Sequence, residues 1–374
     1  MSQAAVGVGF IGTGMISDTY LENLTAFPDI RVVILGDLDT ERAAAQAAKH
    51  GVAQSGTPDD VLAHPDVEIV VNLTIPAAHV PVSLAALAAG KHVWSEKPIG
   101  VDREEAKKLL EAAAAAGKRV GIAPDTVLGP GLQTARRALA RGDIGQPLSA
   151  QTSMQYIGPD IFHPNPEFLF ARGAGPVIDM GPYYITALVN VFGPVARVGA
   201  VGLKGRTTRT VRVGERVGTE FPVEVPTLVQ AVAQFEAGAT SQSIFSFDSP
   251  LARSGIIEIT GTEGTMIIPD PNTFGGDVKI SGMPTLESLQ NGPEWHTLDP
   301  VGVEAGRGLG VLDMARAIRA NKPHIATGDL GYHVFDTLMG IEESVGSGQF
   351  VEVESTVGAV PLVPEDRDPF AATL

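Results

Sequence analysis

The sequence predicts an α/β protein whose N-terminal part is a doubly wound parallel sheet. Short apolar strands alternate with helical segments over the first 124 residues, and the first strand–helix junction is a glycine-rich turn. After residue 124 strand-like segments dominate, which predicts an α+β domain with a large, mainly antiparallel sheet. We therefore expect a Rossmann-type domain over residues 1–124 and a substrate-binding and oligomerisation domain over residues 125–374.

Composition narrows the class of protein. The chain has 374 residues, of which 44% are hydrophobic and 19% charged, so it can bury a sizeable core. Its formal net charge of −16 argues against nucleic acid and anionic membranes as partners. The absence of cysteine excludes disulfides and thiolate catalysis. The N-terminus lacks a basic region and no apolar run reaches membrane-spanning length, so we expect no signal peptide and a cytoplasmic protein.

The first predicted strand, residues 6–11, leads into the turn Gly12-Thr13-Gly14-Met15-Ile16-Ser17. Gly12 allows a tight turn, Gly14 lets a pyrophosphate approach the backbone, and Ser17 is small enough for close helix–strand packing. The following helix would offer free N–H groups to phosphate. The pattern predicts a dinucleotide site.

A second predicted strand, residues 31–36, ends at Asp37, about 20 residues past the turn. A carboxylate there would accept hydrogen bonds from ribose hydroxyls and repel a 2′-phosphate, and the adjacent Leu38 adds no cation. We therefore expect NAD, with NADP less favoured. Asp37 as a simple strand-end or capping residue is the alternative.

The alternation continues to residue 123. Predicted helices and strands are residues 40–50, a short helix from Pro58, strand 67–73, helix 81–89, strand 92–95, helix 103–116 and strand 119–123. Strand 92–95 runs into Glu96-Lys97-Pro98, where the proline ends it. Lys97 is thereby placed at the carboxyl end of a strand, the edge at which open α/β sheets bind ligands. By itself, Lys97 could equally be a solvated turn residue.

The second domain begins with a predicted helix, residues 131–140, and a strand, residues 148–156. A proline- and glycine-rich loop over residues 157–176 leads to a buried helix, residues 177–192. Further strands are predicted at residues 228–235, 240–247, 255–260, 265–268 and 277–281. Two late helices are predicted at residues 310–320 and 329–347.

Four segments together resemble the glucose–fructose oxidoreductase / inositol dehydrogenase (Gfo/Idh/MocA) family. They are residues 9–16, 89–98, 143–147 and 173–181, and the resemblance covers nearly the whole chain. It implies a nicotinamide-dependent dehydrogenase or reductase acting on CH–OH groups of sugars, polyols or cyclitols. It also implies a cofactor site at Gly12, Gly14, Met15, Ile16, Asp37, Leu73, Thr74, Pro76, His79, Glu96 and Lys97.

The same resemblance implies catalytic roles. The lysine of the family's Glu-Lys-Pro segment, which helps to bind and polarise the reacting oxygen, corresponds to Lys97. The family's D-x-G-x-H motif corresponds to Asp179-Met180-Gly181-Pro182-Tyr183, so a tyrosine replaces the usual proton-carrying histidine. A phenol has a pKa of about 10, but a cation such as Lys97 could lower it. Tyr183 as proton carrier and Tyr183 as a packing or sugar-contact residue both remain open.

Other residues qualify that assignment. His163, on the proline-braced loop, is an alternative proton carrier, whereas His333 on a late helix favours a packing role. The family's Asn-Arg pair after the fifth strand is replaced by Asp125-Thr126, so we expect different polar contacts with the substrate. The histidines show no metal-ligand spacing, and we expect no metal.

Three functions are compatible with these residues. The first is an NAD-dependent sugar or polyol dehydrogenase. The second retains its cofactor and recycles it during an internal oxidoreduction or a redox-assisted elimination. The third is a non-catalytic dinucleotide sensor, which the presence of Lys97 and Asp179 disfavours. A broad sheet with one exposed face also predicts a homodimer or homotetramer.

Overall fold

The computed structural model describes residues 4–374, and by internal contacts they form two compact units. The first unit contains the chain up to Pro130, Gly302–Tyr332 and Val363–Leu374, and the second contains Gly131–Val301 and His333–Leu362. Neither unit is one continuous stretch, whereas the division expected after residue 124 is linear. Residues 1–3, on which the expected lack of a signal peptide partly rests, lie outside the described residues.

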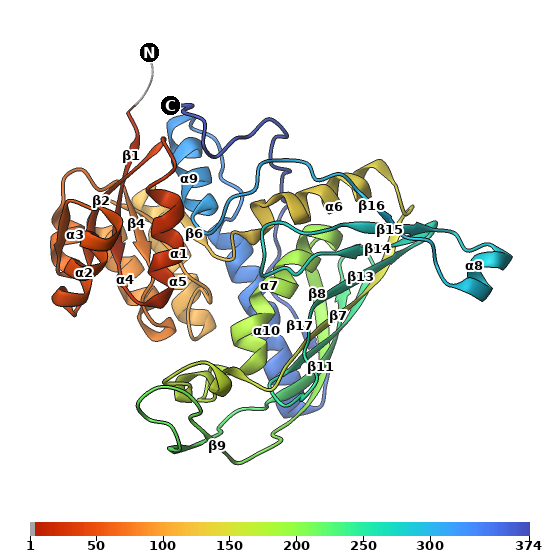
Figure 1. The fold of residues 1–374 in the computed structure, drawn as a ribbon. Coiled ribbons are helices and arrows are strands. Elements are labelled where there is room, and N and C mark those ends of the chain that lie inside the picture. Colours follow the sequence, from red (N-terminus) through yellow and green to blue (C-terminus); the bar gives the residue numbers. More distant parts are fainter. Residues whose placement is uncertain (1–3) are drawn as a thin grey trace. The chain divides into compact units, whose positions relative to one another are not determined.

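The first unit is built on a parallel six-stranded sheet in the order β3-β2-β1-β4-β5-β6. This confirms the predicted doubly wound fold (Figure 1). The strands are β1 (Val6–Ile11), β2 (Ile30–Gly36), β3 (Gln54–Gly56), β4 (Ile69–Asn72), β5 (His92–Ser95) and β6 (Val120–Ile122). The strand order reverses between β1 and β4, which is where such sheets bind ligands at the carboxyl edge.

Capping residues mark the ends of several helices of this unit. Asp39 caps α2 by accepting from the Arg42 N–H at 3.1 Å, and Gly51 ends it with a φ of 68°. Thr57 and Asp60 form a capping box at α3. The helices are α1 (Met15–Leu24), α2 (Thr40–His50), α3 (Pro58–Ala63), α4 (Pro76–Ala88), α5 (Arg103–Ala116), α9 (Leu309–Arg319) and the 3₁₀ turn η1 (Thr126–Leu128).

Helix α4 begins five residues before the position that the sequence predicted. Pro76 occupies the first turn, where its missing N–H costs nothing, and Pro81 lies inside the helix. A proline in the interior removes one hydrogen bond without ending a helix that packs on its neighbours. Starting at Pro76 places the buried His79 in the first turn of α4.

The second unit carries a nine-stranded sheet in the order β16-β15-β14-β13-β7-β12-β11-β8-β17. Its pairs are antiparallel except β7 with β12, which confirms the mainly antiparallel sheet. The strands are β7 (Pro147–Gln155), β8 (Val195–Leu203), β11 (Leu228–Phe235), β12 (Thr240–Ser246), β13 (Arg253–Gly261), β14 (Gly264–Ile268), β15 (Lys279–Gly282), β16 (His296–Thr297) and β17 (Val351–Glu352); β9 (Thr208–Thr210) and β10 (Glu220–Pro222) form a separate pair.

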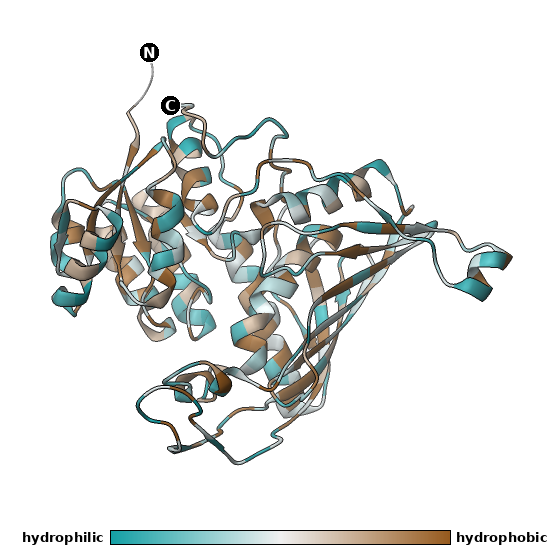
Figure 2. Ribbon diagram, viewed as in Figure 1, coloured by the Kyte–Doolittle hydropathy of each residue, from teal (hydrophilic) through white to brown (hydrophobic). Residues whose placement is uncertain are grey.

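Helices cover one face of this sheet. Helix α7 packs on β7, β11 and β12, and the inward side chains of β11 and β12 are buried while the outward ones are not. Figure 2 shows this alternation as mixed hydropathy along the strands. The remaining elements are α6 (Pro130–Arg141), α7 (Gly175–Phe192), α8 (Leu286–Asn291), α10 (Gly328–Ser347) and the 3₁₀ turns η2 (Pro159–Ile161) and η3 (Glu167–Leu169).

Close packing in the first unit joins β5 to two helices. Trp94 of β5 is fully buried, its indole N–H donates to the Tyr20 hydroxyl of α1 at 3.2 Å, and its ring lies against Gly310 of α9. An added Cβ at Gly310 would lie 1.9 Å from the Trp94 Cη2 atom. By contrast, a Cβ at Gly346, in the last turn of α10, would meet nothing within 4 Å.

Gly310→Ala and Gly346→Ala should therefore change stability in opposite directions, although both place alanine in a helix. We expect Gly310→Ala to lower the free energy of unfolding by about 1–3 kcal/mol through overpacking. We expect Gly346→Ala to raise it by up to about 1 kcal/mol, because alanine is the better helix former. Urea unfolding of both variants measures this. Equal effects would show that the Trp94 contact does not constrain residue 310.

Candidate active site

The glycine turn after β1 has the geometry that a dinucleotide requires. Gly12 has a φ of +100°, and an added Cβ would lie 2.7 Å from the backbone of Leu73, so only glycine fits this approach of two strand ends. Gly14 caps α1, and a Cβ there would point into open space. Ser17 is buried, with its hydroxyl donating to the Gly14 carbonyl at 2.7 Å. The turn thus leaves room for a pyrophosphate at the helix N-terminus.

Asp37 lies at the end of β2 with its carboxylate already hydrogen bonded. Oδ2 accepts from the Thr13 N–H at 2.7 Å and the Thr13 hydroxyl at 2.8 Å. Oδ1 accepts from the Arg42 guanidinium at 2.6 Å. Burial opposes the charged form, but these hydrogen bonds outweigh it and lower the pKa of Asp37 to about 2. Asp37 is therefore anionic, and it also fixes the glycine turn.

The sequence argument about Asp37 considered only its neighbour Leu38 and missed Arg42. This arginine lies in the first turn of α2, is about half exposed, and forms an ion pair with Asp37. A guanidinium there can also bind phosphate. Arg42 therefore offsets part of the repulsion that the Asp37 carboxylate would exert on a 2′-phosphate. The i+5 spacing from Asp37, with Asp39 as the helix cap, is the signal that could have revealed it.

Three large apolar side chains stand exposed at the same edge of the sheet. Met15, Leu38 and Ile75 are 76%, 92% and 68% exposed and follow β1, β2 and β4 respectively. Leu38 and Ile75 were not predicted as site residues, because a lone exposed aliphatic carries no sequence signal. Together with the open glycine turn, they fit a dinucleotide whose base packs between apolar side chains.

At the end of β5, buried groups position Lys97. Glu96 is 8% exposed, and its Oε1 accepts from the Tyr20 hydroxyl at 2.9 Å while its Oε2 accepts from the Lys97 N–H at 3.0 Å. Burial and the charge of Glu96 raise the pKa of Tyr20 well above its usual value, so its hydroxyl remains a donor. Glu96 thus acts on the backbone of Lys97, which is half-buried.

The residues that replace the family's Asn-Arg pair are buried. Asp125 and Thr126 are 0% and 2% exposed. Asp125 Oδ2 accepts from the N–H groups of Gly308 and Gly310 at 2.8 and 3.1 Å, so the carboxylate caps helix α9. Burial raises the pKa of Asp125. The structure therefore gives this carboxyl group a helix-capping role.

In the second unit, helix α7 carries Asp179 and Tyr183 four residues apart, hence on one face. Tyr183 is 5% exposed, and Asp179 is half-buried. The next residue, Tyr184, points to the sheet, where its hydroxyl accepts from the Gly255 N–H at 2.7 Å. This contact fixes the rotation of α7 about its axis, and with it the direction of the Asp179 and Tyr183 face.

A second phenol, which the sequence analysis missed, lies within the electrostatic reach of Asp179. Burial, and then the charges of Asp179 and Asp160, raise the pKa of Tyr156 above its usual value, so it remains protonated. Its ring stacks on Phe162, with centroids 6.3 Å apart. Tyr156 directly follows β7, and only the tertiary structure brings this strand end to α7.

His163 lies on the loop between β7 and α7 and is half-buried. Its Nδ1 accepts from the Asn165 N–H at 3.0 Å, which leaves Nε2 as the ring's donor when it is neutral. A buried ion pair holds the start of this loop: Arg209 donates to Asp160 at 2.7 Å and to the Ile157 carbonyl at 2.6 Å. The loop that carries His163 is thus fixed at its base.

The other candidates have structural roles. His333 is fully buried, its Nε2 accepts from the Val195 N–H at 2.9 Å, and its Nδ1 contacts Ser355, which confirms a packing histidine. Among residues 4–374, no group of three or more His, Asp or Glu side chains could hold a metal ion. In the same part of the chain, no helix has both the length and the apolar character to cross a membrane.

Comparisons with known proteins agree with this geometry. Residues 6–123 match a sequence model described as the oxidoreductase family with an NAD-binding Rossmann fold, and residues 132–267 match the GFO/IDH/MocA C-terminal domain. The chain therefore belongs to the Gfo/Idh/MocA oxidoreductase family, as its sequence motifs predicted.

Two curated relatives and one solved structure illustrate the range of the family. The chain is 26% identical over 354 residues to 1,5-anhydro-D-fructose reductase of Ensifer adhaerens, covering 93% of this chain and 98% of the relative. It is 26% identical over 277 residues to trans-1,2-dihydrobenzene-1,2-diol dehydrogenase of Bos taurus, covering 73% and 77%. A levoglucosan dehydrogenase in complex with NADH and L-sorbose shares the fold, with a TM-score of 0.79, 21% identity and coverage of 94% and 99%.

The hydrogen bonds of Asp37 predict an acid-sensitive contribution to stability. Its folded pKa of about 2 lies below the value of about 3.9 for an unfolded chain. The contribution is therefore complete above about pH 4 and is lost as the pH falls toward the folded pKa. Asp37→Asn should be destabilised relative to wild type at pH 7, and this difference should shrink between pH 4 and pH 2 in urea unfolding.

Arg42→Gln is the matched variant, because it keeps the carboxylate and removes its cation. It should shift the acid loss of stability to higher pH. A wild-type/Asp37→Asn difference that stays constant from pH 7 to pH 2 would contradict the ionic role of Asp37.

Proposed function

We propose that this protein is an NAD-dependent dehydrogenase or reductase that acts on a hydroxyl or carbonyl carbon of a sugar, polyol or cyclitol. The observation that supports this most directly is the carboxyl edge of the parallel sheet, where the open glycine turn follows β1, the anionic Asp37 follows β2 and the anchored Lys97 follows β5. Sugar reductases and dehydrogenases among the relatives support the substrate class.

Each residue of the candidate site has a defined role in this proposal. The nicotinamide, when bound, accepts or donates the hydride. Lys97 binds and polarises the reacting oxygen, and Tyr183 takes or gives the hydroxyl proton, with Asp179 orienting it. The Thr13–Asp37 network and the N-terminus of α1 hold the dinucleotide. Tyr156, which remains protonated, serves as a hydrogen-bond donor to the substrate.

A screen of sugars, polyols and cyclitols with NAD and NADP, followed at the nicotinamide absorbance, tests the proposal. We expect NAD to give the higher kcat/KM, because the Asp37 carboxylate would face a 2′-phosphate as like charge. Asp37→Ala should reduce the ratio of kcat/KM with NAD to kcat/KM with NADP. This reduction should be larger in Asp37→Ala, which retains Arg42, than in the Asp37→Ala/Arg42→Ala double variant. A wild-type preference for NADP would overturn the assignment of the cofactor.

The screen also separates the two other functions. NAD(H) that stays bound through purification, with turnover that needs no added cofactor, would indicate internal oxidoreduction or redox-assisted elimination. Tight binding of NADH without turnover of any panel member would indicate a dinucleotide sensor.

Lys97→Ala should lower kcat by about 100-fold or more, as expected for a polarising or proton-transfer group. Because Lys97 belongs to a loop whose backbone is held by other side chains, the affinity for NADH should change much less. Steady-state kinetics together with an NADH fluorescence titration measure the two effects. Normal turnover by this variant would show that Lys97 is only a turn residue.

Tyr183→Phe keeps the buried ring and removes only the hydroxyl, so we expect a large loss of kcat with little loss of stability. A catalytic phenol also implies an alkaline optimum for oxidation, because its base form must be populated. His163→Ala is the parallel variant. If His163→Ala abolishes activity while Tyr183→Phe keeps both the rate and the pH–rate profile of wild type, the proton belongs to the loop histidine.

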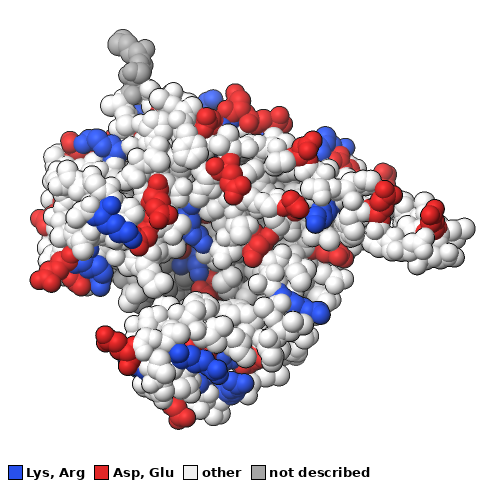
Figure 3. Space-filling model, in the orientation of Figure 1, with Lys and Arg blue, Asp and Glu red and all other residues white. Residues whose placement is uncertain are grey.

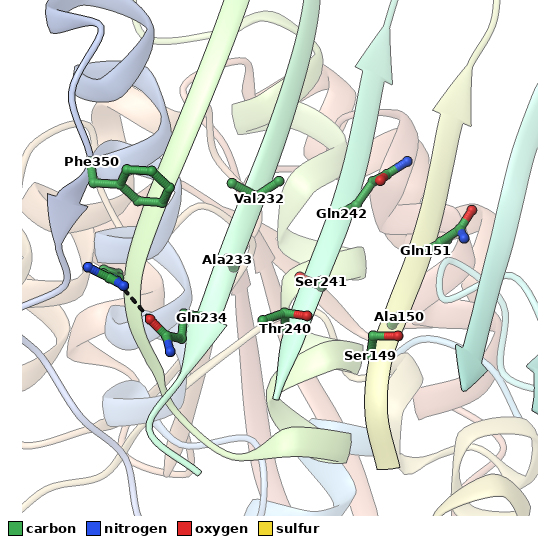
Figure 4. A pocket seen from close by; sticks show the side chains of 11 residues that line it. Ser149, Ala150, Gln151, Val232, Ala233, Gln234, Thr240, Ser241, Gln242 and Phe350 are labelled. Carbon is green, nitrogen blue, oxygen red and sulfur yellow. Dashed lines mark hydrogen bonds between the residues drawn. The ribbon is translucent and has the colours of Figure 1, made fainter. Parts of the chain in front are cut away.

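We also propose that the open face of the nine-stranded sheet pairs two copies of the chain into a homodimer, or a homotetramer through a further contact. The outward positions of the central strands are Ser149, Gln151, Ser153, Arg197, Gly199, Val201, Leu203, Gln230, Val232, Gln234, Thr240, Gln242 and Ile244. Arg197 is the one charged residue among them; it donates to Gln234 at 2.7 Å and lies over the Phe350 ring. Figure 4 shows Gln234, Val232 and Phe350 on this face.

Depletion of charge is typical of the centre of a protein–protein interface. Elsewhere this acidic chain carries interspersed charges on its surface, as the face in Figure 3 shows. Two copies of an acidic protein repel each other least where carboxylates are scarce. This sheet face carries few charges, Arg197 on β8 and Glu258 on β13, which pairs with Gln151. It is therefore the surface that we expect to be self-complementary.

Val232→Lys should dissociate the oligomer, because it places a charge at the centre of this face on a residue that is already 44% exposed. Val217→Lys is the control, since this valine is 60% exposed and lies outside the sheet. Light scattering coupled to size exclusion measures the mass. Wild-type protein that elutes as a monomer would overturn the proposal.

A further inference from the structure

His79 is buried in the first turn of α4, with a relative exposure of 1%. Its Nδ1 lies 2.6 Å from the Pro98 carbonyl oxygen, and its Nε2 lies 3.0 Å from the Thr74 carbonyl oxygen. Carbonyl oxygens only accept, so the ring binds a loop only through a nitrogen that carries a proton. Burial lowers the pKa of His79 and favours the neutral ring, whose single N–H donates to one of the two carbonyls in each tautomer.

The two carbonyls belong to the two loops that border the proposed nicotinamide site. Pro98 follows Lys97 directly, at the end of β5. Thr74 follows β4, next to the close approach of Gly12 to Leu73. β4 and β5 are adjacent strands, so a single imidazole lies between the carboxyl ends of both.

We propose that His79 is a positioning residue whose two tautomers donate in turn to the Pro98 carbonyl, which fixes Lys97, and to the Thr74 carbonyl, which fixes the cofactor-facing loop. This inference rests on the proposed function of Lys97 and of the dinucleotide site. Lys97 is then held on both sides by buried side chains, by Glu96 at its own N–H and by His79 at the next carbonyl.

Other hydrogen bonds anchor the backbone of His79, so that a substitution can remove the ring's contacts without displacing the helix. Asn72 donates to the His79 carbonyl at 2.9 Å and to the Ser83 hydroxyl at 3.1 Å, so the helix backbone is anchored independently of the imidazole. The Thr74 hydroxyl donates to Asn72 Oδ1 at 2.6 Å. Removing the ring's donors should therefore release the loops while α4 stays in place.

The two bonds can be tested separately. The amide nitrogen of asparagine is as many bonds from Cβ as Nδ1, and that of glutamine as many as Nε2. His79→Asn can keep the bond to Pro98, and His79→Gln can keep the bond to Thr74. His79→Leu keeps neither, and Ser83→Ala is the control for a buried polar change in α4 that contacts neither loop.

We expect His79→Asn to retain most of kcat with a weaker affinity for NADH, and His79→Gln to retain the affinity for NADH with a lower kcat. A misplaced catalytic group can cost up to about 100-fold in rate. His79→Leu should show both losses, and Ser83→Ala neither. Equal losses of kcat and affinity in His79→Asn and His79→Gln, or the reverse assignment, would overturn the proposal, since a filler of buried volume predicts no such split.

Two readouts need no substrate and keep this test separate from the proposed function. NADH titration reports the loop at Thr74. The rate at which Lys97 reacts with acetic anhydride, followed by peptide mass spectrometry, reports the loop at Pro98. This rate should equal that of wild type in His79→Asn and differ in His79→Gln, even if no member of the substrate panel is turned over. An unchanged labelling rate in His79→Gln and His79→Leu would overturn the positioning of Lys97.

Discussion

The close approach of two backbones at Gly12 is the constraint on which the cofactor-binding part of this protein depends. A side chain at this position would collide with the Leu73 backbone, so β1 and β4 can end side by side only if residue 12 is glycine. From that approach follow the open turn at Gly14 and the exposure of the α1 N-terminus. The neighbouring strand ends then present Asp37 and Lys97 at the same edge.

Buried carboxylates hydrogen bond to the backbone segments that form this edge. Asp37 binds the turn through Thr13, Glu96 binds the Lys97 backbone, and Asp125 caps α9, which packs on β5. Hydrogen bonds to both oxygens of Asp37 and of Glu96 offset the cost of burying these polar groups. Asp125 accepts two hydrogen bonds at Oδ2, while its Oδ1 has no hydrogen-bond partner among the described residues. Some acidic residues of this chain, whose formal net charge is −16, thus stabilise its backbone by accepting hydrogen bonds.

The second unit prepares its helix face by different means. Tyr184 pins α7 to β13, and the Arg209–Asp160 ion pair pins the base of the His163 loop. Tyr156 is positioned by the end of β7 and by its stacking on Phe162, within the electrostatic reach of Asp179. The face carrying Asp179 and Tyr183 is therefore flanked by elements that are fixed by buried hydrogen bonds and an ion pair.

The sequence by itself determined the alternation of strands and helices, the glycine turn, Asp37 and the strand end at Lys97, because these depend on local periodicity, on capping and on the special backbones of glycine and proline. It also determined the family, through four local motifs. Only the tertiary structure decided the partners of those residues. The apolar pair Leu38 and Ile75, the helix-capping role of Asp125 and the approach of Tyr156 to Asp179 all join groups without a local pattern. Such contacts arise when strand order and helix packing bring distant segments together, and neither is encoded in the spacing of any single stretch.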